Sequence, residues 1–107
     1  MYHLQINHIT REPIDGFPAI SGTTDPDNPE EGYVIIQASD QGLYIEINDQ
    51  INSAYGALAG YDAGDGFVTL QLNQPLGSLG ATVIRLESEV GIPEIIGGLK
   101  EVLSCQL

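Results

Sequence analysis

The chain has 107 residues, of which 42% are hydrophobic, and it carries 15 acidic residues against three basic ones, a formal net charge of −12 at pH 7. This length fits a single domain over residues 1–107 with a modest core, and the hydrophobic fraction excludes a disordered chain. A surface this acidic repels nucleic-acid phosphates and anionic membranes and attracts a basic partner, although the same charge could serve solubility alone.

The termini and the cysteine content bear on where the protein works. Cys105 is the single cysteine, which excludes an internal disulfide and fits a reducing compartment. The first residues lack a basic segment followed by an apolar one, and no run of about 18 apolar residues occurs anywhere. We therefore expect a soluble, cytoplasmic protein.

The first part of the chain predicts two strands separated by a loop. Apolar and polar residues alternate from Tyr2, which predicts a strand over residues 2–9. Residues 18–32 contain three prolines, two glycines and four carboxylates without an apolar period, so we expect a surface loop there. The run from Tyr33 to Ser39 is apolar and rich in β-branched residues, which predicts a buried central strand.

We expect the rest of the chain to be organised around residues 42–72. In residues 43–48 each apolar residue is followed by a tyrosine or a polar residue. This alternation is typical of a strand with one buried and one exposed face. Residues 48–50 are polar and predict a turn after this strand.

Two further strands are predicted within the same stretch. Residues 54–62 mix glycines and small residues with tyrosines, which indicates a weaker, bent or bulged strand. The Asp65-Gly66 pair predicts a hairpin turn, because glycine adopts the positive φ that such turns require. A strand over residues 67–72 would then complete an antiparallel meander of three strands.

The C-terminal part of the chain predicts a strand and then a helix. Residues 81–87 alternate as a strand does. After Pro93, which suits a first helical turn, apolar residues recur at spacings of three and four and predict an amphipathic helix. These residues are Ile92, Ile95, Ile96, Leu99 and Leu103. The Gly97-Gly98 pair weakens the helix unless it allows a close approach to the sheet. We therefore predict an α+β domain: a mostly antiparallel sheet of about five to six strands with one C-terminal helix packed on one face.

The residues that could carry chemistry do not form a recognisable active site in the sequence. No serine lies in a nucleophile-elbow motif, Cys105 has no evident base, and the glycine spacings do not fit a phosphate-binding loop. His3 and His8 would point to opposite faces of one strand, and the acidic run over residues 25–31 lacks the glycine of a calcium loop. We expect neither an enzyme nor a cofactor or metal site.

Tyrosines among carboxylates indicate a face that binds a protein, because the rings supply rigid contact area and the charges pair with a basic partner. The predicted partner-binding residues are Tyr44, Glu46, Asn48, Asp49, Gln50, Tyr55, Tyr61 and Asp62. In this prediction Tyr55 and Tyr61 share a face of one strand. The alternative is that the tyrosines pack beneath the helix with their hydroxyls at the rim.

The segment GLYIEINDQINSAYGALAGYDAGDGFVTLQL resembles the immunity protein 10 family of bacterial polymorphic toxin systems. Its members show a strand of the form Y-I/V-E-hydrophobic-N/D-D-Q, then a Y-G-G motif, a hairpin and a closing helix rich in leucine. The match runs through residues 44–50, Tyr55 and Gly56, and Ala57 replaces the usual second glycine.

The resemblance implies an α+β domain that binds a co-encoded toxin protein in the cytoplasm and neutralises it by stoichiometric occlusion. The acidic surface fits this function, since many toxin domains are basic nucleases. Two alternatives remain open: a homo-oligomeric interaction module, such as a homodimer through an exposed sheet edge, and a ligand- or calcium-binding domain that uses the acidic loops.

Overall fold

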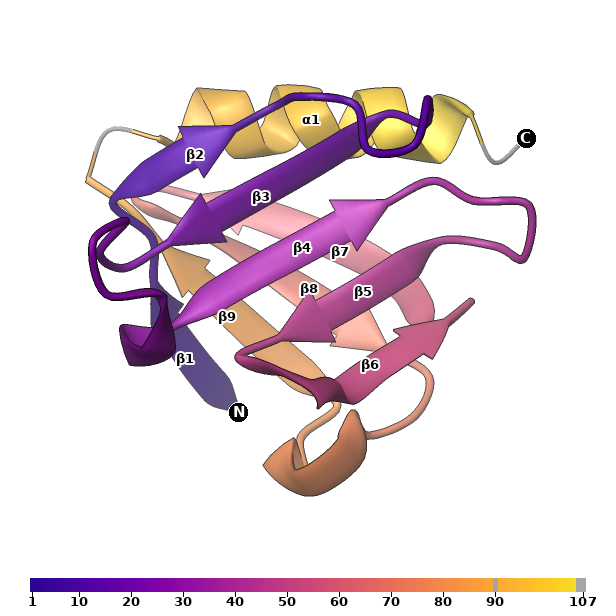
Figure 1. The fold of residues 1–107 in the computed structure, drawn as a ribbon. Coiled ribbons are helices and arrows are strands. Elements are labelled where there is room, and N and C mark those ends of the chain that lie inside the picture. The colour runs from indigo at the N-terminus through magenta and orange to yellow at the C-terminus, as the bar shows by residue number, and fades with distance from the viewer. Residues whose placement is uncertain (90, 106–107) are drawn as a thin grey trace.

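The computed structural model describes residues 1–89 and 91–105, which form two β-sheets and one C-terminal helix (Figure 1). The four-stranded sheet has the order β1 (Tyr2–Gln5), β9 (Val83–Glu87), β8 (Phe67–Leu72), β7 (Leu58–Gly64). The five-stranded sheet has the order β2 (His8–Thr10), β3 (Ala19–Thr23), β4 (Tyr33–Gln37), β5 (Tyr44–Ile47), β6 (Asp49–Tyr55). Helix α1 spans Ile92–Ser104, and two 3₁₀ helices span Pro29–Glu31 and Gly77–Leu79. Neighbouring strands are antiparallel except β1 and β9, which are parallel.

The predicted α+β class, with mostly antiparallel strands and one C-terminal helix, is confirmed. The described strands, however, divide between two sheets that pack face to face, as Figure 1 shows with the four-stranded sheet behind the five-stranded one. Apolar residues of both inner faces meet in one core, which includes Ile36 and Ile45 from one sheet and Leu70 and Ile84 from the other. The sheets thus bury each other's apolar face, as sandwiches do.

The chain first changes sheet between Ile6 and Asn7. The Ile6 N–H donates to the Glu87 carbonyl at 2.7 Å, which continues the pairing of β1 with β9. The Asn7 N–H donates to the Thr23 carbonyl at 2.9 Å, which begins the pairing of β2 with β3. The strand predicted over residues 2–9 is therefore two strands in two sheets.

The second change of sheet lies at Gly56 and Ala57. The Gly56 N–H donates to the Leu43 carbonyl at 2.9 Å in the five-stranded sheet, and the Ala57 carbonyl accepts from the Asn73 N–H at 2.8 Å in the four-stranded sheet. Gly56 has a φ of 69°, which glycine adopts without steric cost. The single strand predicted over residues 54–62 and the three-stranded meander are therefore wrong: β6 and β7 belong to different sheets.

The loop predicted over residues 18–32 is wrong for its first part, because Ala19–Thr23 forms β3 between β2 and β4. Gly22 suggested a loop, but it lets the β3 backbone pack closely against the Ile6 side chain. A Cβ at this position would lie 2.7 Å from Ile6. Ile20 is 4% exposed and points into the core. Residues 24–32 do form a loop, in which Asp25 Oδ1 accepts from the Asp27 N–H at 2.9 Å.

Helix α1 packs against β3 and β4 of one sheet and β8 of the other. It buries Ile95, Leu99 and Val102, and Gly98 lies against the inward-facing Ile20. The helix therefore lies on the inner side of the five-stranded sheet, and Figure 1 shows it along the β2–β3 end with β4 to β6 open in front of it.

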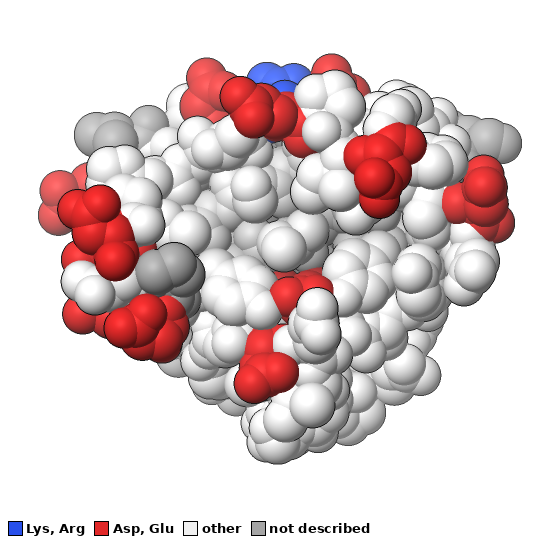
Figure 2. Space-filling view, in the orientation of Figure 1, with Lys and Arg blue, Asp and Glu red and all other residues white. Residues whose placement is uncertain are grey.

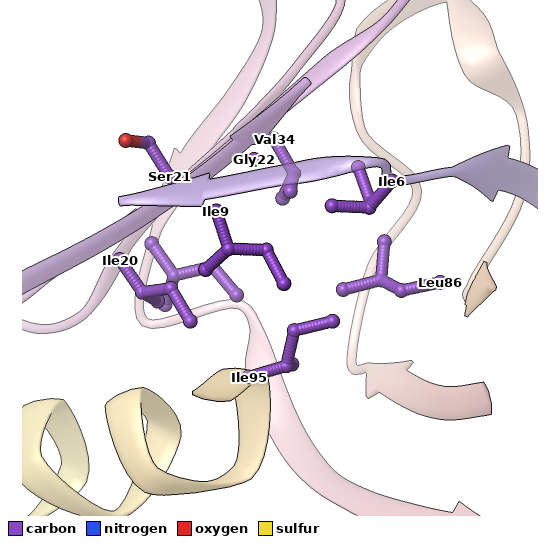
Figure 3. A pocket seen from close by; sticks show the side chains of 9 residues that line it. Ile6, Ile9, Ile20, Ser21, Gly22, Val34, Leu86 and Ile95 are labelled. Carbon is purple, nitrogen blue, oxygen red and sulfur yellow. The ribbon is translucent and has the colours of Figure 1, made fainter. Parts of the chain in front are cut away.

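A small apolar cavity of about 10 Å³ lies where α1 meets the sheets (Figure 3). Its lining includes Ile6, Ile9, Ile20, Leu86 and Ile95, whose side chains converge in Figure 3. A water held there would need two to four polar partners, but the lining is apolar and the Ser21 hydroxyl points away from the cavity in Figure 3. The cavity is therefore a packing gap in the core.

The solvent-facing side of the four-stranded sheet carries a cluster of charged side chains. His3 Nδ1 and Glu87 Oε1 lie 2.8 Å apart across β1 and β9, and Arg85 Nε lies 3.8 Å from the same carboxylate oxygen. The hydrogen bond from His3, assisted by the Arg85 charge, lowers the pKa of Glu87 below its ordinary value of 4.5. The Arg85 guanidinium also stacks on Phe67, 3.8 Å from the ring centroid.

We predict opposite effects for alanine at the two helix glycines. A Cβ at Gly98 would lie 2.6 Å from Ile20 Cδ1, so Gly98→Ala should lower the free energy of unfolding by about 1–3 kcal/mol through overpacking. A Cβ at Gly97 would meet only the flexible end of the Arg11 side chain. Gly97→Ala should therefore raise the free energy of unfolding by about 0.5–1 kcal/mol. Urea denaturation followed by circular dichroism measures both, and equal effects would contradict the packing described.

We also predict that Glu87 contributes to the acid sensitivity of the fold. Because its folded-state pKa is depressed, its stabilisation is present above its ordinary value of 4.5 and is lost as the pH falls below that value. Glu87→Gln removes this titration, so its urea midpoint should fall less than that of the wild type between neutral and acidic pH. Parallel midpoint curves for the two proteins would refute this.

Candidate partner-binding face

The outward-facing residues of the five-stranded sheet form one continuous surface. Cross-strand pairing places Ile35, Glu46 and Ser53 in one row and Gln37, Tyr44 and Tyr55 in the next. These positions alternate with buried ones that point to the core. We call this surface the outer face and define it by Ser21, Thr23, Tyr33, Ile35, Gln37, Tyr44, Glu46, Ser53 and Tyr55.

A carboxylate held by two tyrosines lies in the middle of the outer face. The Tyr33 hydroxyl donates to Glu46 Oε2 and the Tyr44 hydroxyl donates to Glu46 Oε1. Glu46 is only 7% exposed. Burial, and then the hydrogen bond to this carboxylate, raises the pKa of both phenols above the ordinary value of 10.0. Both hydroxyls therefore keep their protons and stay hydrogen-bond donors to Glu46.

Tyr55 extends this cluster towards the sheet edge. Its ring is tilted by 49° against the ring of Tyr44, with the centroids 5.1 Å apart. Tyr55 is 50% exposed. Because the Tyr44 ring supports it from one side, Tyr55 presents a rigid aromatic surface to solvent.

Two open hollows flank the cluster. One of about 350 Å³ is lined by Thr23, Tyr33, Ile35 and Glu46 among others, and a second of about 220 Å³ includes Tyr55 in its lining. Figure 2 shows this side of the molecule, hollowed near its middle, with acidic side chains spread around its margin. Among the described residues in that view, basic side chains show only at the top, beside α1. The outer face is thus an uneven, aromatic and acidic surface.

Asn48, one of the predicted partner-binding residues, uses its side chain within the fold. It has a φ of 64°, and its Oδ1 accepts from the Tyr33 N–H at 2.9 Å. Its Nδ2 donates to the hydroxyl of Tyr2 on the four-stranded sheet. Asn48 therefore forms the turn between β5 and β6 and ties the two sheets together.

Asp49 and Gln50 follow Asn48 and are exposed at the start of β6. Asn48 alone separates β5 from β6, and Ile47 pairs with Asp49. The register then shifts between Ile47 and Glu46, which pairs with Ser53, so the ladder is irregular at the predicted turn. Asp49 and Gln50 lie at the sheet edge, beside the outer face.

Tyr61 and Asp62 lie away from the other predicted residues, because β7 belongs to the four-stranded sheet. Tyr61 is half-buried against the core. Asp62 is exposed, and its Oδ2 accepts from Gln71 Nε2 at 2.6 Å on the neighbouring strand. The prediction that Tyr55 and Tyr61 share a face is wrong, and so is the alternative that Tyr44 and Tyr55 pack beneath the helix.

Several residues of the outer face were missed by sequence reasoning. Tyr33, Ile35 and Gln37 alternate with buried residues along β4, but the continuous apolar run suggested a strand buried on both faces. Thr23 was missed because its strand was taken for a loop. Along β3 the alternation of Ser21 and Thr23 with Ile20 was a signal that could have found Thr23. For Ile35 on β4 the sequence offered no such signal, because its neighbours are apolar as well.

The described residues contain no group of three or more His, Cys, Asp or Glu side chains that could hold a metal ion. His3 and His8 lie in different sheets, on β1 and β2, rather than on one strand. No helix among the described residues has the length and apolar character needed to cross a membrane.

No protein-family model matches this chain, and no curated protein is significantly similar to it. The resemblance to the immunity protein 10 family therefore stays a prediction carried by residues 44–50, Tyr55 and Gly56.

We predict that Asn48 is needed for stability. Asn48→Ala removes the acceptor of the Tyr33 N–H and the donor to Tyr2, and it places alanine at a positive φ. The free energy of unfolding should fall by about 1–3 kcal/mol, measured by urea denaturation. Gln50→Ala, which alters an exposed neighbour, is the control and should change stability by less than about 0.5 kcal/mol. Similar losses in both variants would count against this role of Asn48.

Proposed function

We propose that this protein is an immunity protein, which binds a basic bacterial toxin domain encoded beside it and neutralises that toxin by occlusion. The observation that carries the proposal is the outer face, where Tyr33 and Tyr44 hold the Glu46 carboxylate and Tyr55 packs on Tyr44. The helix leaves this side of the sheet uncovered. The resemblance of residues 42–72 to the immunity protein 10 family supports the same function.

The chemistry of the outer face suits protein recognition. Aromatic side chains contribute much of the binding energy in protein interfaces, since they bury large areas at a low cost in conformational entropy. Tyr44 and Tyr55 support each other, and Tyr33 and Tyr44 are held by Glu46, so little ordering is left for the moment of binding. The face is preorganised for a rigid partner.

The charge of the chain supports a basic partner. With a net charge of −12, the protein attracts a cationic domain over distances of about a Debye length, roughly 8–10 Å at physiological ionic strength. Attraction of this kind raises the association rate, which matters for an inhibitor that must reach a toxin before the toxin reaches its target.

A second candidate function is a homodimer through the edge of the five-stranded sheet. Strand β6 is an edge strand, and its Ile51 side chain is 67% exposed. Light scattering of the purified protein distinguishes this candidate: a monomer at micromolar concentration would remove it.

Co-expression with the toxin domain encoded in the adjacent reading frame tests the proposed function. We expect the two proteins to co-purify in a one-to-one complex and the cells to survive. Failure of this chain to protect cells from that toxin would overturn the proposal.

The place of contact is tested by charge reversals. Asp49→Lys beside the outer face and Asp65→Lys in the β7–β8 turn change the net charge equally, and both positions are exposed. We expect Asp49→Lys to weaken toxin binding at least about tenfold more than Asp65→Lys, as measured by surface plasmon resonance. Tyr55→Ala should weaken toxin binding by a similar factor, and its Tm should fall only slightly, because Tyr55 is 50% exposed and loses only its contact with Tyr44. Equal losses for the two reversals would place the contact elsewhere.

A further inference from the structure

Glu46 is a buried carboxylate that has no cationic partner in the part of the chain that the structure describes. It is 7% exposed, and among the described residues no lysine, arginine or histidine nitrogen lies within 4.0 Å of it. Its hydrogen-bond donors are the neutral hydroxyls of Tyr33 and Tyr44. A buried charge that lacks an opposite charge is costly to maintain, so this arrangement calls for a compensating cation.

The cations of the chain are placed elsewhere. Arg85 stacks on Phe67 on the outer side of the four-stranded sheet, and Arg11 lies 3.7 Å from both Glu94 and Glu101 at the helix. Lys100 is exposed on α1. Of the two histidines, His8 is exposed on β2 and His3 lies 2.8 Å from Glu87 on the four-stranded sheet. A cation that compensates Glu46 must therefore come from another molecule.

The larger hollow gives such a cation access to Glu46. Its volume is about 350 Å³, and Glu46 contributes to its lining together with Tyr33, Ile35, Ser21 and Thr23. A carboxylate can accept about four hydrogen bonds, and the two tyrosines account for one on each oxygen. One acceptor position remains on each oxygen of Glu46.

We propose that the hollow receives a single arginine side chain of the basic partner, whose guanidinium group donates to both oxygens of Glu46 and stacks on the Tyr33 ring. This inference rests on the proposed function and names the partner group that the outer face recognises. Arginine fits better than lysine because its planar fork donates two parallel hydrogen bonds to one carboxylate and stacks on aromatic rings. An ammonium group offers neither feature.

A titration with N-acetyl-arginine amide, followed by ¹H–¹⁵N NMR, tests the inference without the toxin. We expect saturable shifts at the amides of Thr23, Tyr33, Ile35 and Glu46, with a Kd on the order of millimolar. Glu46→Gln keeps the size of the side chain and should weaken binding at least about tenfold. Asp65→Asn, which removes an exposed charge elsewhere, should not.

Three results of this titration would overturn the inference. They are shifts that do not saturate, shifts spread over the acidic surface, and equal affinities of the wild type and Glu46→Gln. N-acetyl-lysine amide serves as the comparison, and binding as tight as that of the arginine amide would overturn the assignment of arginine.

A second pair of variants keeps the test valid if Glu46→Gln does not fold. Thr23→Arg places a guanidinium in the hollow from its own wall, so it should raise the Tm and abolish binding of the arginine amide. Thr23→Met matches much of the added length without the charge and should not raise the Tm. Wild-type binding by Thr23→Arg, or an equal Tm for the two variants, would contradict the inference.

The outcomes separate this inference from the proposed function. If the toxin binds the wild type and Glu46→Gln equally well, the arginine site fails and the immunity function stands. If the arginine amide binds at the hollow but no adjacent toxin is neutralised, the site stands and the immunity function fails.

Discussion

The structure depends on two places where the backbone stops pairing in one sheet and starts in the other. At Ile6 and Asn7, and again at Gly56 and Ala57, one residue completes a ladder of the first sheet and the next begins a ladder of the second. Both changes let short segments of alternating residues cover a shared core with their apolar sides. One residue at each crossing, Ile6 and Ala57, is fully buried and belongs to that core. The arrangement of the outer face follows, since these crossings leave β6 at the edge of one sheet and β7 at the edge of the other.

The outer face contains a buried carboxylate, Glu46, that has no cationic partner among the described residues. The apolar core lies between the sheets, and on the solvent side of β4 and β5 two phenols fix the buried Glu46 carboxylate. Removing a carboxylate from water without a cation is unfavourable, and the hydrogen bonds from Tyr33 and Tyr44 offset part of this cost. Asn48 helps to position these residues. Its side chain accepts from the Tyr33 backbone N–H, and it donates to the Tyr2 hydroxyl on the other sheet. The positions of Tyr33 and Glu46 are therefore set by the fold before any partner arrives.

Local patterns in the sequence were sufficient for much of the secondary structure. The alternation around Tyr44 and Glu46 identified β5 and its outward-facing side, although Glu46 on that side is buried and not exposed as the pattern predicted. The Asp65-Gly66 pair identified the β7–β8 hairpin, and the spacing of Ile95 and Leu99 identified α1. These features depend on interactions between residues that are close in the chain, which is why period and turn chemistry predict them. The sequence also suggested that the helix glycines let the helix pack closely on the sheet, and Gly98 does lie against Ile20 of β3.

What the sequence by itself determined was the α+β class, the outward-facing side of β5 and the acidic character of the surface. Only the tertiary structure decided which strands share a sheet, and hence that Tyr33 joins Tyr44 at Glu46 while Tyr61 lies in the other sheet. The physical reason is that strand pairing is set by contacts between distant segments, to which a local pattern is blind. A glycine at a close approach, such as Gly22, looks the same in sequence as a glycine in a loop, and only the neighbouring Ile6 side chain tells them apart.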